Sequence, residues 1–348
     1  MTETPRTVEA GAAGDGAVSA GAALFMRLRA LGVDFVFCNA GTDFPPIIEG
    51  LAEAAALDIP LPLAVTVAHE HAAMGLAHGV YLATGRPQAL LLHTNVGLAN
   101  AVIGAINAWA DRVPMLLMSG RTPVLEQGRF GGRTEPIGWG QEMRDQAAHV
   151  RECTKWDYEL RFPEQVLDVL DRALAIAAST PEGPVYLSLP REVLCAPCPS
   201  LGLDRKPAMA PQRIAADPVA LGAAAQALAR AERPLVIAQR GAGSAQGFAC
   251  LAELVERWGL PVSHYWAVAL ALPTDHPMNL GSALAPWLEE ADVVLVLDSL
   301  APWSPDQGEP PAGATVIQMG PDPLFQRTPI RDFRSDITVA GETAATLA

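Results

Sequence analysis

Short apolar runs alternate with segments of helical periodicity along most of this chain, and this alternation limits the folds open to it. In the first half, apolar runs lie at 33–41, 63–67, 87–97, 113–123 and 183–190, separated by helical patterns at 46–56, after Glu70, at 98–112 and at 163–179. Strands that are buried on both faces and joined by helices favour a mainly parallel sheet covered by helices on both sides.

A second series of apolar runs follows a segment that is rich in Pro and has little periodicity. These later runs lie at 233–240, 260–266, 291–300, 314–320 and 336–341. Since 348 residues exceed the usual size of one domain, two domains are the natural expectation. We predict an α/β protein with two doubly wound, mainly parallel-sheet domains. The expected divisions are a disordered tail over 1–18, a first domain over 19–192, a linker over 193–213 and a second, Rossmann-like domain over 214–348.

Composition excludes several classes of partner. The formal net charge is −14, which argues against binding to nucleic acid or to an anionic membrane. The N-terminus has no basic segment followed by an apolar one, so it carries no secretory signal pattern. The five cysteines are sparse, and the Cys195–Cys198 pair has no second pair at zinc spacing. We therefore expect a cytoplasmic protein without a metal site of its own.

Polar residues follow the first four apolar runs of the first domain. Ligands of open parallel sheets bind at the carboxyl ends of the strands, so these residues form the candidate site. At the end of the first run these residues are Asn39, Gly41 and Thr42, and at the end of the second they are His69, Glu70 and His71. The third run ends in a predicted polar turn with His93, Thr94, Asn95 and Gly97, and the fourth ends with Ser119, Gly120 and Arg121.

Glu70 is the most informative of these residues. Helical spacing places it on the same face as Ala73, Met74, Ala77 and Tyr81, which is the apolar side of the predicted helix. An acidic residue in the first turn of a helix is usually solvated and favoured by the helix dipole. A carboxyl group on an apolar face is instead desolvated, and it can share a proton near neutral pH.

Several segments together carry a family resemblance. VFCNAGTDFPPIIEGL, AHEHAAMGLAHGVYLATGRPQALLLHTNVGLANAVIGAINAWADRVPMLLMSG and CTKWDYELR resemble the pyrimidine-binding domain of thiamine-diphosphate enzymes, a group that includes acetolactate synthase, benzoylformate decarboxylase and oxalyl-CoA decarboxylase. RPLVIAQRGAGSAQGFACLAELVERWGLPV resembles the start of their central domain. The resemblance implies a catalytic subunit of a lyase or carboligase that acts on a 2-oxo acid or a related carbonyl compound.

The resemblance implies roles for two catalytic residues. The carboxyl of Glu70 would hydrogen-bond N1′ of the cofactor's pyrimidine and favour the imino tautomer, whose nitrogen accepts the C2 proton of the thiazolium ring. His93 matches a histidine that transfers protons to substrate intermediates in benzoylformate decarboxylase. A histidine with a purely structural role at a strand end is an equal alternative.

The remaining site residues are also carried over from the family. Its pattern implies that Gly41, Asn95, Gly97 and Asn100 contact the cofactor, together with Glu70, and that Asn39, Thr42 and Arg121 contact the substrate, together with His93. The match has two departures. Many relatives have Gly-Pro-Gly where this chain has Asn95-Val96-Gly97, and Gln where it has Arg121. Arg121 suits a substrate carboxylate or phosphate, and equally an ion pair with an acidic side chain.

Relatives of full length hold the diphosphate and its metal ion in a third domain, marked by Gly-Asp-Gly and a later Asn pair. The only Gly-Asp-Gly here, at 14–16, lies in the predicted tail, follows no strand and leads to no paired Asn. We therefore expect thiamine diphosphate and Mg²⁺ to be bound jointly with a smaller partner subunit, most simply in an α2β2 complex. A natural or engineered fragment is the alternative.

Three other functions are open at this stage. The segment GAGSAQG at 241–247 follows a predicted strand, as in a nicotinamide-dependent dehydrogenase, although its last Gly is one residue late. The same loop permits FAD or ADP in the central domain, as in some relatives. His69, His71 and His78 permit a metal hydrolase, and a non-catalytic regulatory or scaffolding subunit would retain the fold alone.

Overall fold

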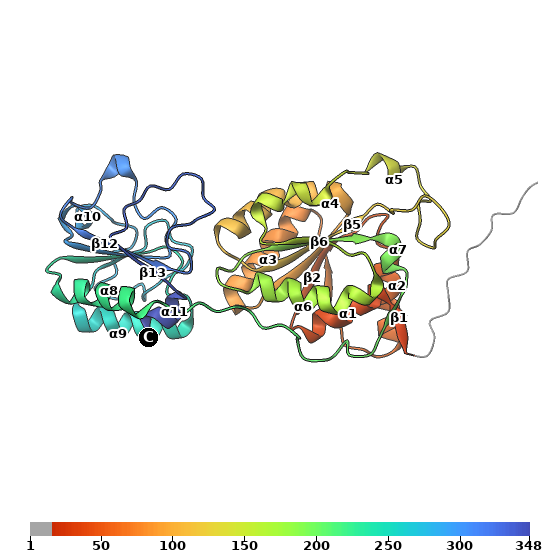
Figure 1. Cartoon of the computed structure of the whole chain (residues 1–348), viewed down its shortest axis with the longest axis horizontal. Coiled ribbons are helices and arrows are strands. Elements are labelled where there is room, and N and C mark those ends of the chain that lie inside the picture. Colours follow the sequence, from red (N-terminus) through yellow and green to blue (C-terminus); the bar gives the residue numbers. More distant parts are fainter. Residues whose placement is uncertain (1–15) are drawn as a thin grey trace, which may run out of the picture. The chain divides into compact units, whose positions relative to one another are not determined.

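A computed structural model of the chain describes residues 16–348. These residues form two compact units, and the boundary between them along the chain lies between residues 212 and 213. Each unit contains one large sheet with helices on both faces (Figure 1). All strand pairs within the two large sheets are parallel, so the predicted α/β class with two mainly parallel sheets is confirmed. Residues 1–15 of the predicted tail lie outside the described residues.

The first unit carries a six-stranded sheet with the strand order β3-β2-β4-β5-β7-β6. Its elements are β1 (Ala17–Ser19), α1 (Ala20–Ala30), β2 (Phe35–Asn39), α2 (Pro45–Ala56), β3 (Leu63–Thr66), α3 (Glu70–Thr84), β4 (Gln88–Leu92), α4 (Thr94–Ala110), β5 (Met115–Arg121), α5 (Ile137–Gly140), β6 (Asp157–Glu159), α6 (Val166–Ala177), β7 (Val185–Pro190), α7 (Arg191–Leu194) and β8 (Pro197–Pro199). The central strands β4, β5 and β7 are buried along their whole length, as expected of strands covered on both faces.

Two apolar cores cover the two faces of this sheet. One core joins α1 and α6 to the sheet through residues such as Phe25 and Leu170. The other joins α3 and α4 through residues such as Met74 and Leu98. Because α3 follows β3, α4 follows β4 and all strands of this sheet are parallel, both helices begin at the carboxyl edge of the sheet.

Helices α3 and α4 approach each other closely at one position. A Cβ atom on Gly104 would lie 2.4 Å from Cβ of Met74, closer than packed carbon atoms can come. Glycine at 104 therefore allows a helix separation that alanine would widen. Both Met74 and Gly104 are buried in this contact.

The structure differs from the sequence-based prediction in three places. Strand β3 lies at the edge of the sheet, so Leu63 is exposed and the run 63–67 is not the buried strand expected from its apolar residues. Residues 94–97, predicted as a turn, form the start of α4 because Gly97 donates to the carbonyl of His93. Residues 197–199, within the predicted linker, form β8.

Strand β8 pairs antiparallel with β1, which includes residues 17 and 18 of the predicted disordered tail. Two short strands in a separate ribbon tolerate the prolines of 197–199, because only some of their backbone groups need partners.

The second unit carries a five-stranded sheet with the order β10-β9-β11-β12-β13. Its elements are α8 (Pro218–Arg230), β9 (Pro234–Ala238), α9 (Ala245–Trp258), β10 (Val262–Ser263), α10 (Trp287–Glu290), β11 (Val293–Leu297), β12 (Thr315–Gly320), β13 (Ile337–Ala340) and α11 (Thr343–Leu347). The predicted strand at 260–266 is shorter than expected. In residues 16–348, no helix has the length and apolar character needed to cross a membrane.

The close contact between α3 and α4 yields a stability prediction. Gly104→Ala should lower the free energy of unfolding by ~1–3 kcal/mol, because the new methyl group overlaps Met74 and forces the helices apart. Gly79→Ala on the exposed face of α3 is the matched control, since no atom lies within 4 Å of its added Cβ. The control should raise stability by ~0.5–1 kcal/mol, as alanine favours a helix interior. Urea unfolding of the two variants measures both changes.

Candidate functional site

The strand order of the first sheet places a ligand crevice beside β2 and β4. From β2 the chain moves outward to β3 and then returns across β2 to β4, so its direction reverses between these two strands. The crevice at such a reversal, outside the carboxyl ends of the strands, is where ligands bind in open parallel sheets. The segments that follow β2 and β4 contain Gly41, Thr42, Asp43 and His93.

Glu70 lies at the first position of α3 and is buried, with 7% of its surface exposed. The Nδ2 atom of Asn100 in α4 donates a hydrogen bond to Oε2 of Glu70 at 3.0 Å. Gly97 packs beside the other carboxylate oxygen, because a Cβ there would lie 3.1 Å from Oε1. Glu70, Gly97 and Asn100 are thus brought together, and the predicted helix face with Ala73, Met74 and Ala77 is buried.

His93 caps the N-terminus of α4 and makes a close contact with Asp43. The distance from Nδ1 of His93 to Oδ1 of Asp43 is 2.5 Å. The other carboxylate oxygen of Asp43 accepts a hydrogen bond from the backbone N–H of Thr94 at 3.2 Å. On the far side of the ring, Nε2 of His93 lies 3.2 Å from Nε2 of Gln141. The ring is therefore held at both nitrogen atoms.

Two glycines leave the space that this pair occupies. A Cβ on Gly41 would lie 2.1 Å from Nδ1 of His93, and a Cβ on Gly120 would lie 1.5 Å from Oδ2 of Asp43. Thr94 has a φ of +36°, a value that side-chain-bearing residues seldom adopt. Strained backbone of this kind concentrates at functional sites, and here it directs an N–H group at Asp43.

The electrostatic environment favours the protonated form of His93. The hydrogen bond with Asp43 is the largest influence and raises the pKa of His93 above its ordinary value of 6.5. Partial burial opposes this shift, while the negative charges of Asp43 and Glu70 add to it. The surroundings of His93 consequently extend its protonated form to a higher pH than that of a free imidazole.

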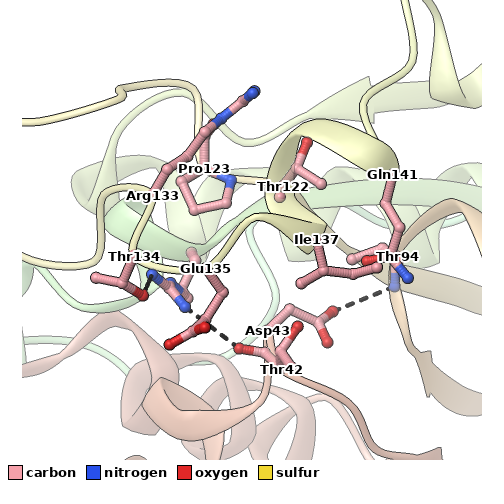
Figure 2. Close-up of a pocket in the computed structure, with 12 residues that line it drawn as sticks. Thr42, Asp43, Thr94, Thr122, Pro123, Arg133, Thr134, Glu135, Ile137 and Gln141 are labelled. Atoms are coloured by element: carbon pink, nitrogen blue, oxygen red, sulfur yellow. Dashed lines mark hydrogen bonds between the residues drawn. The ribbon is translucent and has the colours of Figure 1, made fainter.

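An open recess adjoins this pair on the side of Gln141. Figure 2 shows Thr42, Asp43 and Thr94 facing the segment that contains Arg133, Ile137 and Gln141. The recess is open to solvent and is lined by Thr42, Asp43, Thr94, Thr122, Pro123, Arg133, Thr134, Glu135, Ile137, Gly138, Gln141 and Arg191. Its wall is therefore rich in hydroxyl and charged groups next to His93.

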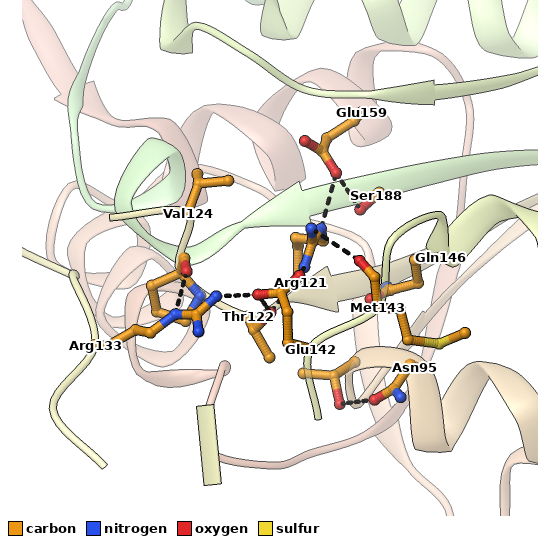
Figure 3. Close-up of polar contacts among 12 residues, drawn as sticks. Asn95, Arg121, Thr122, Val124, Arg133, Glu142, Met143, Gln146, Glu159 and Ser188 are labelled. Atoms are coloured by element: carbon orange, nitrogen blue, oxygen red, sulfur yellow. Dashed lines mark hydrogen bonds and ion pairs between the residues drawn. The ribbon is translucent and has the colours of Figure 1, made fainter. Parts of the chain in front are cut away.

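Arg121 occupies an internal network of polar contacts (Figure 3). Its guanidinium donates to Glu142 at 2.5 Å, to Glu159 at 3.0 Å and to Thr122 at 2.8 Å. A further N–H group donates to the carbonyl of Met143 at 3.3 Å. These contacts occupy most of the N–H donors of Arg121. The residue therefore forms ion pairs with acidic side chains, which is one of the two roles expected from the sequence. A direct contact with substrate stays a prediction.

Three other predicted site residues have different surroundings. Asn39 donates to the carbonyl of Val67 at 3.1 Å and so bridges the ends of β2 and β3. Thr42 lines the recess. Asn95 accepts a hydrogen bond from the hydroxyl of Thr94 at 3.3 Å and remains at the start of α4.

Asp43 and Gln141 are the site residues that the sequence analysis missed. Both contact His93, but they are 50 and 48 residues away from it along the chain. The sequence feature that could have identified Asp43 is its position in the loop after β2, between Gly41 and the prolines that begin α2.

The glycine-rich loop at 241–247 does not have the open form of a dinucleotide site. In a Rossmann loop, the second glycine is small so that a pyrophosphate can approach it. Here a Cβ on Gly243 would lie 3.0 Å from the backbone nitrogen of Ala344 and 3.2 Å from Cβ of Thr343. The chain itself packs against this glycine, unlike the second glycine of a dinucleotide-binding dehydrogenase loop. Binding of FAD or ADP in the central domain stays a prediction.

The histidines of the metal-hydrolase alternative are separately engaged. The side chain of His69 caps α3 by accepting from the backbone of His71. His78 lies 3.5 Å from Asp111. Over the described part of the chain, residues 16–348, no three His, Cys, Asp or Glu side chains gather in a possible metal-binding group.

Two family models match this chain. The model of the N-terminal TPP binding domain of thiamine pyrophosphate enzymes matches residues 18–149, and the model of their central domain matches residues 221–348. A protein named "Probable 2-ketoarginine decarboxylase" from Pseudomonas aeruginosa is 33% identical over 289 residues, which cover 80% of this chain and 48% of that protein.

Benzoylformate decarboxylase gives two further matches. The Pseudomonas aeruginosa protein is 26% identical over 336 residues, covering 92% of this chain and 59% of that protein. The crystal structure from Polynucleobacter necessarius has a TM-score of 0.75 at 21% identity, covering 94% of this chain and 60% of that one, and it supports the fold. The chain thus spans about half the length of these curated relatives.

The raised pKa of His93 predicts a pH dependence of stability. In the unfolded chain His93 titrates near 6.5, whereas in the folded chain it titrates at a higher pH. Its contribution is therefore fully present below pH 6.5 and is lost as the pH rises through the folded-state value. His93→Gln should destabilise the chain most at pH 5.5, and the difference from the unchanged chain should shrink at alkaline pH. Urea unfolding at several pH values, with His71→Gln as the control, measures this effect.

Proposed function

This chain belongs to the thiamine pyrophosphate enzyme family, and we propose that it forms the pyrimidine-binding part of a decarboxylase or carboligase. The substrate would be a 2-oxo acid or a related carbonyl compound. The observation that carries the proposal is the buried carboxyl of Glu70, held by Asn100 where α3 and α4 begin. A desolvated carboxyl beside an amide suits the recognition of a polar heteroaromatic ring.

The residues of the first unit fit the pyrimidine end of thiamine diphosphate. Glu70 would hold a proton against the pyrimidine N1′ atom, and Asn100 would keep its carboxyl oriented. When bound, the cofactor supplies a carbon nucleophile that can accept the carbonyl carbon of the substrate. His93 contacts Asp43 and Gln141, which both line the adjoining recess. In that recess His93 could exchange protons with groups derived from the substrate.

We further propose that the diphosphate and Mg²⁺ are completed by a smaller partner subunit, most simply in an α2β2 assembly. The matched models are those of the N-terminal and central domains of the family. The outer surface of α3 and α4 also exposes large apolar side chains, at Leu76 (46% exposed), Val96 (44%), Ile103 (65%) and Ile106 (51%). Large exposed apolar side chains on two helices that pack together beside a candidate site favour a protein–protein interface there.

Glu70→Gln tests the catalytic assignment. Glutamine preserves the shape of the side chain and can still accept from Asn100, but it cannot exchange a proton with the pyrimidine. Activity of the assembled enzyme should therefore fall by at least ~10²-fold, with unchanged unfolding of the chain. Glu49→Gln, an exposed position on α2, is the matched control and should leave turnover unchanged. Near-normal activity of Glu70→Gln would refute the assignment.

Ile103→Glu tests the proposed interface. A charge at this exposed position should leave the isolated chain folded, but it should prevent the apolar face of α3 and α4 from being buried against the partner. Co-sedimentation with the diphosphate-binding subunit should then be lost, together with thiamine-diphosphate-dependent turnover. Leu57→Glu, exposed at the end of α2, is the control. A homo-oligomer of this chain with full activity would contradict the two-subunit proposal.

A further inference from the structure

Asp43 lies in a loop, yet its side chain is buried and contacts two other groups. Its side chain is 4% exposed, and both carboxylate oxygens are engaged, one with the His93 ring and one with the backbone N–H of Thr94. Gly120, near the end of the buried strand β5, has no side chain and so leaves space for this carboxylate. Three separate segments of the chain therefore cooperate to hold a charged group against one histidine.

The two contacts of the His93 ring are compatible with a single neutral tautomer. A carboxylate has only acceptor atoms, so Asp43 must receive the proton of Nδ1. The amide nitrogen of Gln141 has only donor character, so Nε2 of His93 must present its lone pair there. When the ring is neutral, both neighbours therefore favour the tautomer with the proton on Nδ1 and with Nε2 open to accept one.

We propose that Asp43 is the positioning residue of His93, fixing the ring so that Nε2 is the nitrogen that exchanges a proton with the ligand in the recess. Asp43 acts through His93 and needs no contact with the substrate itself. Its part in the reaction rests on the proposed function, whereas its control of the ring is a property of this chain alone.

The backbone N–H of Thr94 makes one substitution especially informative. In Asp43→Asn, the atom that faces this N–H must be the amide oxygen, because a donor cannot face a donor. The amide NH₂ group then faces Nδ1 of His93 and donates to it. The ring must move its proton to Nε2, so the variant should reverse the tautomer with almost no change in shape. In Ser-His-Asp triads, the same exchange gives the wrong tautomer and lowers turnover by ~10⁴-fold.

Several charged groups near the His93 ring influence its titration, and the test must separate their effect from that of Asp43. Asp43 and Glu70 are the carboxylates that act on the charge of His93. Arg133, Glu135 and Arg191 line the same recess as Asp43, while Gln141 is neutral. These other groups are the same in the variant and the unchanged chain, so a difference in the titration of His93 reports on position 43.

The experiment is ¹⁵N NMR of the histidine rings in the isolated full chain, with His93 assigned by its loss in His93→Gln. At pH values above its titration, the unchanged chain should show His93 with the proton on Nδ1, and Asp43→Asn should show it on Nε2. The midpoint of the His93 titration should fall in the variant. Asp145→Asn, an exposed carboxylate paired with Arg151, should change neither property.

Several results would overturn the proposal. A proton on Nε2 in the unchanged chain would do so without any variant, as would an unchanged tautomer in a folded Asp43→Asn. If Asp43→Asn does not fold, Asp43→Ala should give a mixed tautomer and a lower titration midpoint, and an unaltered ring would refute the role of Asp43.

Turnover in the assembled enzyme provides the second readout. Asp43→Asn should lower it by at least ~10²-fold, with thiamine diphosphate binding retained. Normal turnover with a reversed tautomer would refute the link to the reaction. The reversed tautomer in a chain that shows no thiamine-dependent activity with any partner would instead refute the proposed function and leave the control of His93 by Asp43 intact.

Discussion

The close approach of α3 and α4 determines the geometry of the candidate site. Met74 and Gly104 meet where a single added carbon atom would not fit. One helical turn earlier on each helix, Glu70 meets Asn100. The two contacts have the same spacing along both helices, so the helices run side by side from a shared edge of the sheet. A wider separation at Gly104 would withdraw the amide from a buried carboxyl that needs it.

The fold followed from the sequence because the decisive signals are local. Apolar runs and helical periodicity identified the parallel sheets, and the spacing of Ala73, Met74 and Ala77 correctly placed Glu70 on the buried face of α3. The exposure of β3 was not predictable in this way, because an apolar run does not tell whether its strand lies at the centre or at the edge of a sheet.

The polar contacts of the site were much harder to predict, since they join segments that are distant in sequence. Asp43 is one acidic residue in a loop until β2 and β4 pair and bring it to His93. Arg121 was assigned from its place at a strand end, the family pattern and its charge, while its acidic partners Glu142 and Glu159 lie 21 and 38 residues later. Periodicity identifies the buried face of an element but gives no information on which polar groups will meet at its end.

The two large sheets have the same order over their first four strands, yet the contacts at their chain reversals differ. In the second sheet the reversal lies between β9 and β11, and there Arg240 donates to the carbonyl of Asp298 while Gln239 accepts from the backbone of Leu300. These contacts join the two strand ends directly.

In the first sheet, the corresponding position holds His93, whose Nε2 atom contacts the side chain of Gln141 beside an open recess. The contact between His93 and Gln141 joins two side chains, whereas each of the two contacts in the second sheet joins a side chain of one strand end to the backbone that follows the neighbouring strand. The same topology thus ties the strand ends together in the second unit and leaves a histidine beside an open recess in the first, and this difference supports the proposal that the chemistry takes place in the first unit.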